Sequence, residues 1–466
     1  MRTVIFSTLF ILFATPMLAD EAADLAAAVD RIREQHELAA AVVIVVDAES
    51  ILLEHYSGII DWDSPKPVTR DTYFRIGSIS KAFTGLALLR AEQLGQLQLD
   101  QQVSDFLSEP QYDNRWEETN PLRVAQLQEH TAGWYDMSGQ EFNDKNPKPL
   151  SVAESLAMRP QSRVMRWPPG WHSEYSNSGP GLVSYVIEQA SGAVFDSYIA
   201  GQVFKPLGMH SASLLLTPEI SGALATGYNT DYQSVIPYWH IVFRASGGVN
   251  VLPVDMAKFM QMLLNRGQLG GRAVFSEAQI ERLETPTTTL AATTGLRYGY
   301  GLGIYSILHN GHVLLGHGGD ADGYLAHFRY SRESGKAYFA VINAFNHAPL
   351  RALQNLLNDY LVAGLPDHEK PDVPAIDHAI LESYTGSYRP ASVRFPGNGW
   401  QDKTLQIKLE GDRLLSTENG RRWRRLYPVN KRHFRRSDEP VATAAFVPVE
   451  NGRMVLQGRM GNWIRD

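Results

Sequence analysis

The sequence predicts an α/β protein of the mixed α+β kind, in which one large domain is followed by a small all-β module. Two observations carry this prediction. Strand-like runs stand near both ends of the first 363 residues, and a long helical region lies between them. Beyond a proline-punctuated stretch, short β-rich runs follow one another to the end of the chain.

Residues 1–19 have the features of a secretory signal peptide that is removed after Ala19. Arg2 precedes an apolar run from Val4 to Phe13, and acidic residues begin at Asp20. A membrane anchor is the alternative, but the run is shorter than the roughly 20 residues that a spanning helix needs. We therefore expect a secreted or periplasmic protein. The 466 residues include no cysteine, which excludes disulfides and a cysteine nucleophile.

The large domain is predicted over residues 20–363. It opens with a helix over 23–33, and two strands follow over 39–46 and 51–56. Helical patterns dominate from about residue 80 to 310, including one that starts after Ser78 and one over 256–264. Strand patterns return at 312–315, 324–330 and 337–343, and a helix follows over 350–362. Because strands enclose the helices, one sheet should draw on both ends of this segment.

Three prolines, Pro366, Pro371 and Pro374, mark a linker over residues 364–378. Residues 379–466 then form the all-β module, with strands predicted over 405–409, 413–416, 443–449 and 453–457.

The module is basic, whereas the rest of the chain is acidic. Residues 379–466 hold 16 Lys and Arg against 9 Asp and Glu, and residues 1–378 hold 27 against 41. Its basic run could contact an anionic surface such as cell-wall polymer or lipid, or form a solvated face of a barrel. No nucleic-acid partner is expected, because no recognition motif accompanies the charge. The run comprises Arg421, Arg422, Arg424, Arg425, Lys431, Arg432, Arg435 and Arg436.

Three motifs in the large domain can carry chemistry. Ser78-x-x-Lys81 stands at a predicted helix start, so the Lys81 amine lies one turn from the Ser78 hydroxyl and can activate it. The Ser78 N–H can point at a developing oxyanion. A surface lysine above an N-cap serine is the alternative.

The second motif is Tyr175-x-Asn177, which follows a Pro-Gly turn, and its phenol can relay a proton next to a lysine. The third is His317–Gly318–Gly319–Asp320 beside a strand pattern, where glycines allow a substrate backbone to approach and the Asp320 N–H can face an oxyanion. Taken singly, Tyr175, Asn177 and His317 are also consistent with structural roles.

Together and in this order, the three motifs resemble the signatures of the β-lactamase-related serine hydrolases. That family includes class C β-lactamases, serine D-Ala-D-Ala carboxypeptidases, D-aminopeptidases and related esterases. The resemblance covers about residues 25–363 and implies a β-lactamase/transpeptidase-like domain, in which an antiparallel sheet is flanked by helices. The module, which starts near Tyr384–Thr385–Gly386–Ser387–Tyr388, resembles the lipocalin-like barrel appended to many of these hydrolases.

The resemblance also implies a role for each motif residue. Ser78 is the nucleophile, Lys81 its electrostatic partner and candidate base, and Tyr175 the proton shuttle. Substrate binding is implied for Asn177, His317, Gly318 and Gly319, and the oxyanion hole for the backbone N–H groups of Ser78 and Asp320. The reaction needs no metal and no organic cofactor.

His317 stands where most β-lactamases have lysine, and an ordinary imidazole with a pKa near 6.5 is mostly neutral above neutrality. We therefore expect a small-molecule or peptide substrate, cleaved by peptidase activity on D-amino-acid peptides or by esterase activity. β-Lactamase activity and a penicillin-binding sensor or cell-wall adaptor without turnover are the alternatives. Two further expectations are a pH-dependent limb in the histidine range and stronger penicillin acylation after His317→Lys. The sequence identifies no arginine that must hold a substrate carboxylate.

Overall fold

The computed structural model describes residues 16–466 except 110, 370, 396, 398, 419, 437–438, 450–451 and 460. Most of the predicted signal peptide, residues 1–15, lies outside the described residues. The first described element is helix α1 (Pro16–Gln35), which includes the helix predicted over 23–33. Among the described residues, no helix has both the length and the apolar character needed to cross a membrane.

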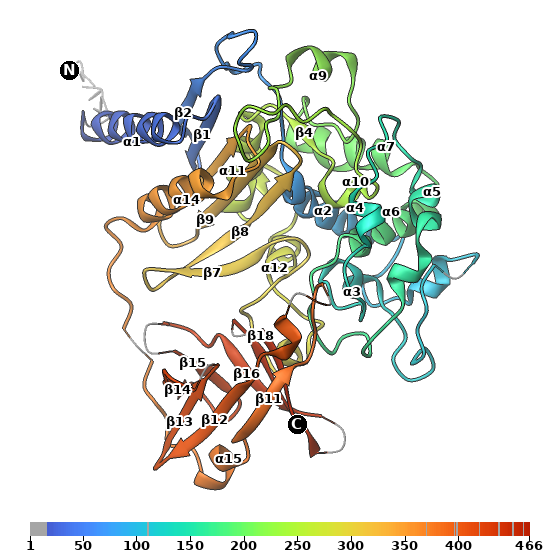
Figure 1. Cartoon of the computed structure of the whole chain (residues 1–466), viewed down its shortest axis with the longest axis vertical. Helices are drawn as coiled ribbons and strands as arrows, with labels where there is room; N and C mark the ends of the chain where they lie inside the picture. Colours follow the sequence, from blue (N-terminus) through green and yellow to red (C-terminus); the bar gives the residue numbers. More distant parts are fainter. Residues whose placement is uncertain are drawn as a thin grey trace, which may run out of the picture.

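The large domain is built on a six-stranded sheet in which every neighbouring pair is antiparallel (Figure 1). The spatial order is β2-β1-β10-β9-β8-β7, so strands from both ends of the domain share one sheet, as the sequence predicts. The strands are β1 (Ala40–Asp47), β2 (Ile51–Gly58), β7 (Tyr305–His309), β8 (His312–Ala321), β9 (Tyr324–Ser331) and β10 (Lys336–Ile342).

Helices cover both faces of this sheet, which explains why β1 is apolar from Ala40 to Val46. Val42, Ile44 and Val46 pack into the larger core with α2 (Ser80–Gln93) and α11 (Asp255–Leu264). The alternate residues Ala41, Val43 and Val45 face α1 and α14 (His347–Val362). Figure 1 shows the sheet between α1 and α14 on one side and α2 on the other.

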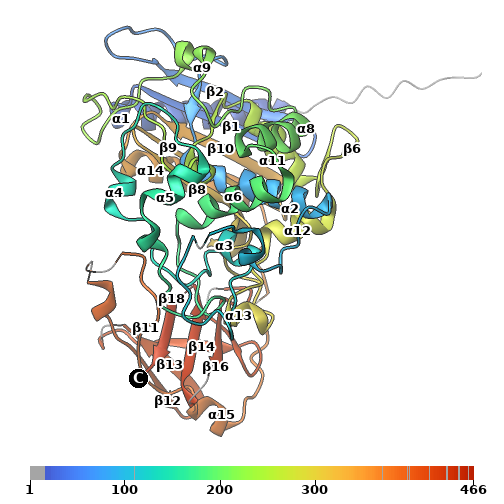
Figure 2. The same cartoon turned by 90° about the vertical axis from the view of Figure 1, so that its right-hand side faces the viewer.

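Short elements fill the part of the chain between β2 and β7, and several of these helices pack around α2 (Figure 2). The helices are α3 (Val124–Gln128), α4 (Gly139–Phe142), α5 (Val152–Met158), α6 (Ser178–Ser191), α7 (Phe195–Ile199), α8 (Lys205–Leu207), α9 (Pro218–Ala223), α10 (Arg244–Gly247), α12 (Glu277–Glu284) and α13 (Leu290–Thr293). Two small two-stranded sheets pair β3 (Phe74–Arg75) with β4 (Asn250–Val251) and β5 (Gln268–Leu269) with β6 (Arg272–Ala273).

The C-terminal module is a closed antiparallel barrel of the strands β11 to β18, preceded by α15 (His378–Glu382). Its core contains Tyr388, Phe446 and the fully buried Trp463. The all-β barrel predicted from the sequence is therefore confirmed. The strands are β11 (Gly386–Pro390), β12 (Leu405–Glu410), β13 (Arg413–Thr417), β14 (Arg424–Pro428), β15 (His433–Arg435), β16 (Ala444–Pro448), β17 (Met454–Gly458) and β18 (Gly461–Arg465).

Several strands were not predicted. β7 is partly exposed along its whole length, so it lacks the apolar alternation that marks a half-buried strand. β8 was expected to end at residue 315, but it continues to Ala321 through three glycines, whose low strand propensity concealed it. In the barrel, β11, β14, β15 and β18 are short and rich in polar residues or glycine, which weakens their pattern.

The barrel is docked on the large domain rather than only tethered to it (Figures 1 and 2). Ala291 and Leu296 pack with Ala445 and Val447 in one apolar cluster. Gln457 accepts a hydrogen bond from the N–H of Ala291 at 2.8 Å. The two units thus share both apolar and polar contacts.

Two barrel side chains also reach the segment that precedes Tyr175. Gln457 donates to the Trp171 carbonyl at 2.5 Å, and Asn462 donates to the Ser173 carbonyl at 2.7 Å. The barrel therefore fixes the loop that carries the second sequence motif.

Candidate active site

The three sequence motifs meet in a cleft of about 790 Å³ that lies between β8, the start of α2 and a barrel loop. This volume is in the range of small-molecule and peptide sites. Lys81 lies directly behind the cleft wall and is fully buried. Of the predicted site residues, the cleft is lined by Ser78, Tyr175, Asn177, His317, Gly318 and Asp320.

Close packing of β8 against the turn before α2 positions Ser78. Ser78 lies in a 3₁₀ turn (Gly77–Ile79) that leads into the helix. Gly77 has φ +52°, and a Cβ atom there would come within 2.6 Å of the Asp320 backbone. A Cβ atom at Gly319 would collide with the Ile76 carbonyl oxygen. These two glycines let β8 approach closely, which brings the backbone of Asp320 next to Ser78.

Lys81 is held by three oxygen atoms. Its Nζ donates to Ser78 Oγ at 3.2 Å, to Asn177 Oδ1 at 2.7 Å and to the Ser246 carbonyl at 2.7 Å. Burial lowers the pKa of the Lys81 ammonium well below its ordinary value, and the positive charge of Arg394 lowers it further, while the negative charge of Asp136 acts in the opposite direction. A buried lysine with a lowered pKa can exist as a neutral amine, which has a lone pair to accept a proton.

A chain of polar contacts links Lys81 to the barrel. Asn177 binds Lys81 through Oδ1 and donates from Nδ2 to Asp136 at 3.1 Å. The fully buried Asp136 carboxylate also accepts two hydrogen bonds from Arg394, at 2.9 Å from Nε and 2.7 Å from Nη2. Arg394 comes from the loop after β11, so the barrel supplies a charged side chain to this site.

Two basic side chains lie near the ring of Tyr175. Lys81 Nζ lies 4.7 Å from the ring centroid, and Arg394 Cζ lies 4.6 Å from it. Burial raises the pKa of the Tyr175 phenol far above its ordinary value, and hydrogen bonding with Ser78 opposes that rise. The phenol therefore stays protonated at neutral pH. It can pass a proton on, but it is not present as a phenolate that could act as the base.

His317 is a neutral, fully engaged side chain rather than a titrating one. Its Nε2 lies 2.9 Å from the Tyr300 hydroxyl, and its Nδ1 contacts the Gly318 carbonyl. A carbonyl only accepts, so Nδ1 carries the proton and Nε2 accepts from Tyr300. Burial lowers the pKa of His317 to about 3, helped by the positive charge of Lys81. The expected pH limb from His317 in the ordinary histidine range is therefore wrong, because the sequence pattern did not reveal this burial.

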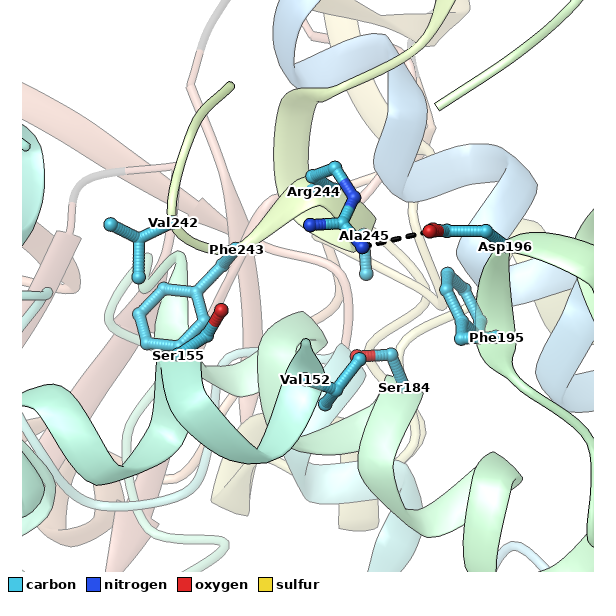
Figure 3. Close-up of a pocket in the computed structure, with 9 residues that line it drawn as sticks. All are labelled: Val152, Ser155, Ser184, Phe195, Asp196, Val242, Phe243, Arg244 and Ala245. Carbon is cyan, nitrogen blue, oxygen red and sulfur yellow. Dashed lines mark hydrogen bonds and ion pairs between the residues drawn. The ribbon is translucent and has the colours of Figure 1, made fainter. Parts of the chain in front are cut away.

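A buried ion pair supports the carbonyl that binds Lys81 (Figure 3). Arg244 at the start of α10 donates to Asp196 at 2.7 Å, and the short helix ends next to Ser246, whose carbonyl receives Lys81. The pocket drawn around this pair has only about 10 Å³ of free space, which is room for about one water molecule. It is a packing feature that fixes α10 and not a second binding site.

Glu174 lies at the interface between the two units, next to the barrel residues Ser392 and Arg394. Burial raises the pKa of its carboxyl to about 7, while a hydrogen bond with Ser392 and the charge of Arg394 oppose that rise. The folded protein therefore binds a proton between the ordinary value of 4.5 and about pH 7 that the unfolded chain does not bind. Stability from this group is complete below that window and is lost as pH rises through it.

We predict that the free energy of unfolding falls by up to about 3 kcal/mol between pH 4.5 and 7 because of Glu174. Thermal unfolding measured from pH 4.5 to 8 should show this slope in the native protein. Glu174→Gln should flatten it, whereas Glu382→Gln, which changes an exposed carboxyl, should not. An identical slope in native protein and Glu174→Gln would contradict this assignment.

Sequence reasoning missed three residues of the site. Asp136 and Arg394 belong to no local motif, and they meet only because the barrel docks on the large domain. Tyr300 is one of 20 tyrosines and carries no distinguishing neighbours in the chain. The sequence identified no arginine at the site, whereas the structure places Arg394 in the lining of the cleft.

Comparisons with known proteins agree with this architecture. A family model described as "Beta-lactamase" matches residues 25–362. Penicillin-binding protein 4* of Bacillus subtilis (strain 168) is 25% identical over 422 residues, which cover 84% of this chain and 86% of that protein. The octameric penicillin-binding protein homologue from Pyrococcus abyssi has the same fold over 95% of this chain and 99% of its own, with a TM-score of 0.62 and 20% identity. The D-alanine carboxypeptidase AmpC from Burkholderia cenocepacia matches 73% of this chain and 99% of its own, with a TM-score of 0.58 and 18% identity.

Proposed function

The chain belongs to the beta-lactamase family of serine hydrolases, and we propose that it cleaves an amide or ester bond through an acyl-enzyme on Ser78. One observation carries the proposal. Ser78 Oγ lies at the cleft, 3.2 Å from the buried amine of Lys81 and in hydrogen-bond contact with Tyr175. A serine hydroxyl becomes a strong nucleophile when a neighbouring base takes its proton.

Acylation begins with Lys81 in its neutral form. Asn177 and the Ser246 carbonyl accept its two N–H bonds, so the lone pair faces the Ser78 hydroxyl. Ser78 Oγ then bonds to the substrate carbonyl carbon while its proton moves to Lys81. The carbonyl electrons move to oxygen, where the N–H groups of Ser78 and Asp320 stabilise the charge.

The tetrahedral intermediate collapses when the bond to the leaving group breaks. The leaving amine or alcohol receives a proton from the Tyr175 hydroxyl, and Lys81 returns a proton to Tyr175. In the second half of the cycle, water loses a proton to the same pair of residues and attacks the acyl carbon. Ser78 is released with its proton, so the net reaction consumes one water molecule.

One cationic side chain of the cleft can attract a substrate carboxylate, although the carboxylates of Glu141, Asp320 and Asp322 line the same cleft. Arg394 supplies a permanent cation next to the Tyr175 ring, and its side chain remains 37% exposed. A peptide ending in a D-amino acid provides such a carboxylate, and a D-alanine carboxypeptidase is among the proteins with this fold. We propose D-amino-acid peptides as the preferred substrates, with esters of similar shape as a second group. The leader-like residues 1–19 support action outside the cytoplasm.

We predict that Arg394→Ala lowers kcat/KM for carboxylate-bearing peptides by roughly 10- to 100-fold, since hydrogen bonds with charged groups contribute about 1.5–3 kcal/mol. Uncharged esters should lose less. Arg389→Ala, which removes an exposed barrel arginine paired with Asp466, should change neither. Equal losses on charged and uncharged substrates would show that Arg394 only supports Asp136 and does not bind the carboxylate.

A β-lactamase is the second candidate, and Arg394 is the observation that favours it. A penicillin carries a carboxylate beside its reactive amide, and a fixed cation in the cleft could attract it even though His317 is neutral. A penicillin-binding sensor would show the same acylation without turnover.

Intact-mass spectrometry distinguishes these functions. The protein is mixed with D-peptides, short-chain esters and β-lactams, and the added mass and product release are followed over time. Rapid acylation with continued release from D-peptides or esters is the expected result. Continued release from β-lactams alone would indicate a β-lactamase, and one burst of product without a steady state would indicate a sensor. No adduct and no turnover with any substrate class would contradict the proposal.

A further inference from the structure

Two histidines and one glutamate meet at the end of β8 that is farther from the active site. His312 is the first residue of β8, Glu333 lies in the turn between β9 and β10, and His368 lies in the segment between α14 and the barrel. One ligand atom from each falls within 4.8 Å of the other two. No local motif connects these residues, so only the fold brings them together.

Both imidazoles converge on the same carboxylate. His312 Nδ1 lies 2.7 Å from Glu333 Oε2, and His368 Nε2 lies 3.0 Å from the same oxygen. The centroids of the two rings are 4.8 Å apart, and the ring planes are tilted by 51°. Ligands of a tetrahedral zinc ion, at 2.0–2.1 Å from the metal, are separated by about 3.3 Å. Shifts of under about an ångström in the three side chains would therefore admit the ion.

We propose that His312, Glu333 and His368 form a binding site for a divalent transition metal of the zinc type. Two imidazoles and one carboxylate are a ligand set that zinc prefers, with a fourth position for water. The His312 side chain is only 4% exposed, whereas those of Glu333 and His368 are 34% and 39% exposed. One ligand is thus anchored in the sheet, while the other two leave an open path for the ion.

The site would fasten the interdomain segment to the sheet. Figure 1 shows this segment running from α14 along the outside of the molecule to the barrel. Three residues after His368, the Pro371 carbonyl accepts a hydrogen bond from Arg435 of the barrel at 2.8 Å. A metal at His368 would therefore shorten the free part of the connection and stabilise barrel docking. His312 and His317 are five residues apart on β8, which is about 17 Å along an extended strand, so the metal would have no part in the acyl transfer.

The test uses the untagged full-length mature chain, freed of metal with EDTA and titrated with zinc chloride by isothermal titration calorimetry. We expect one zinc ion per chain, with a Kd of micromolar or below, and a melting temperature that rises with zinc. His368→Ala should bind zinc at least tenfold more weakly and lose the rise in melting temperature. Glu333→Gln, which keeps the size of the side chain, should also weaken binding.

The matched control is His378→Ala, which removes another exposed histidine ten residues further along the same connection. It should bind zinc as the native protein does. Magnesium should not replace zinc, because it prefers oxygen ligands. The proposal would be overturned by equal zinc affinity in the native protein and His368→Ala, by no zinc binding in the native protein, or by equal binding of magnesium. The three side chains would then be only a hydrogen-bonded structural group.

Discussion

Ser78→Ala is expected to lower kcat by at least about 10³-fold on any substrate that the protein turns over. The substitution removes the proposed nucleophile and leaves the carbon framework of the turn almost unchanged. Ser78 is only half-buried, so the melting temperature should stay near that of the native protein. Steady-state hydrolysis and thermal unfolding, measured on the same preparation, test both parts.

Ser306→Ala is the matched control, because Ser306 lines the same cleft on β7 but belongs to none of the proposed catalytic contacts. It should retain most of the native rate. A folded Ser78→Ala protein with near-native turnover would end the serine-hydrolase account of this site.

Tyr175→Phe is expected to lower kcat by at least about 10²-fold while KM changes little. The ring and its contacts with Lys81 and Arg394 remain, so substrate binding should persist. What disappears is the hydroxyl that contacts Ser78 and that we propose as the proton carrier. The measurement is the separate determination of kcat and KM.

Tyr305→Phe, which removes a hydroxyl from another ring of the cleft, is the control and should keep a near-native rate. Lys81→Ala should be as damaging as Tyr175→Phe, and the double variant should be less impaired than the product of the two losses, because both residues serve one relay. If the two losses multiply strictly, or if the Tyr175→Phe protein has a native rate, Lys81 and Tyr175 do not serve one proton relay.

The local parts of the fold and site could be predicted because their signals lie close together in the chain. Ser78 and Lys81 are three residues apart, and a helical pattern after Ser78 is enough to put them on one face. The strand pattern of residues 40–46 likewise reflects burial on both sheet faces. The order of the three motifs then indicated the family, and the family indicated the arrangement in space.

Long-range contacts could not be predicted in this way. Asp136 and Arg394 are 258 residues apart, and nothing in the segment around Arg394 distinguishes it from the other basic residues of the barrel. Their pairing depends on how the barrel docks on the large domain. The charge imbalance of the module was visible in the sequence, but not which arginine enters the cleft.

The sequence also did not reveal the electrostatic environment of His317. His317 was expected to titrate near its ordinary pKa, yet burial beside Tyr300 and Lys81 lowers that pKa to about 3. The aromatic rings packed against it belong to Tyr175, Tyr300 and Tyr305, and Tyr305 lies on β7, which had no clear pattern of its own. Replacing His317 with lysine would put a cation into this buried ring cluster, so the gain in penicillin acylation expected from the sequence loses its physical basis.

The most direct test of the central claim is to identify the nucleophilic residue. The native protein is labelled with a fluorophosphonate, which reacts with activated serines, then digested and mapped by peptide mass spectrometry. We expect one adduct per chain on the peptide that contains Ser78, and no adduct in the Ser78→Ala protein. An adduct on another residue, or equal labelling of the Ser78→Ala protein, would contradict the assignment of Ser78 as the nucleophile.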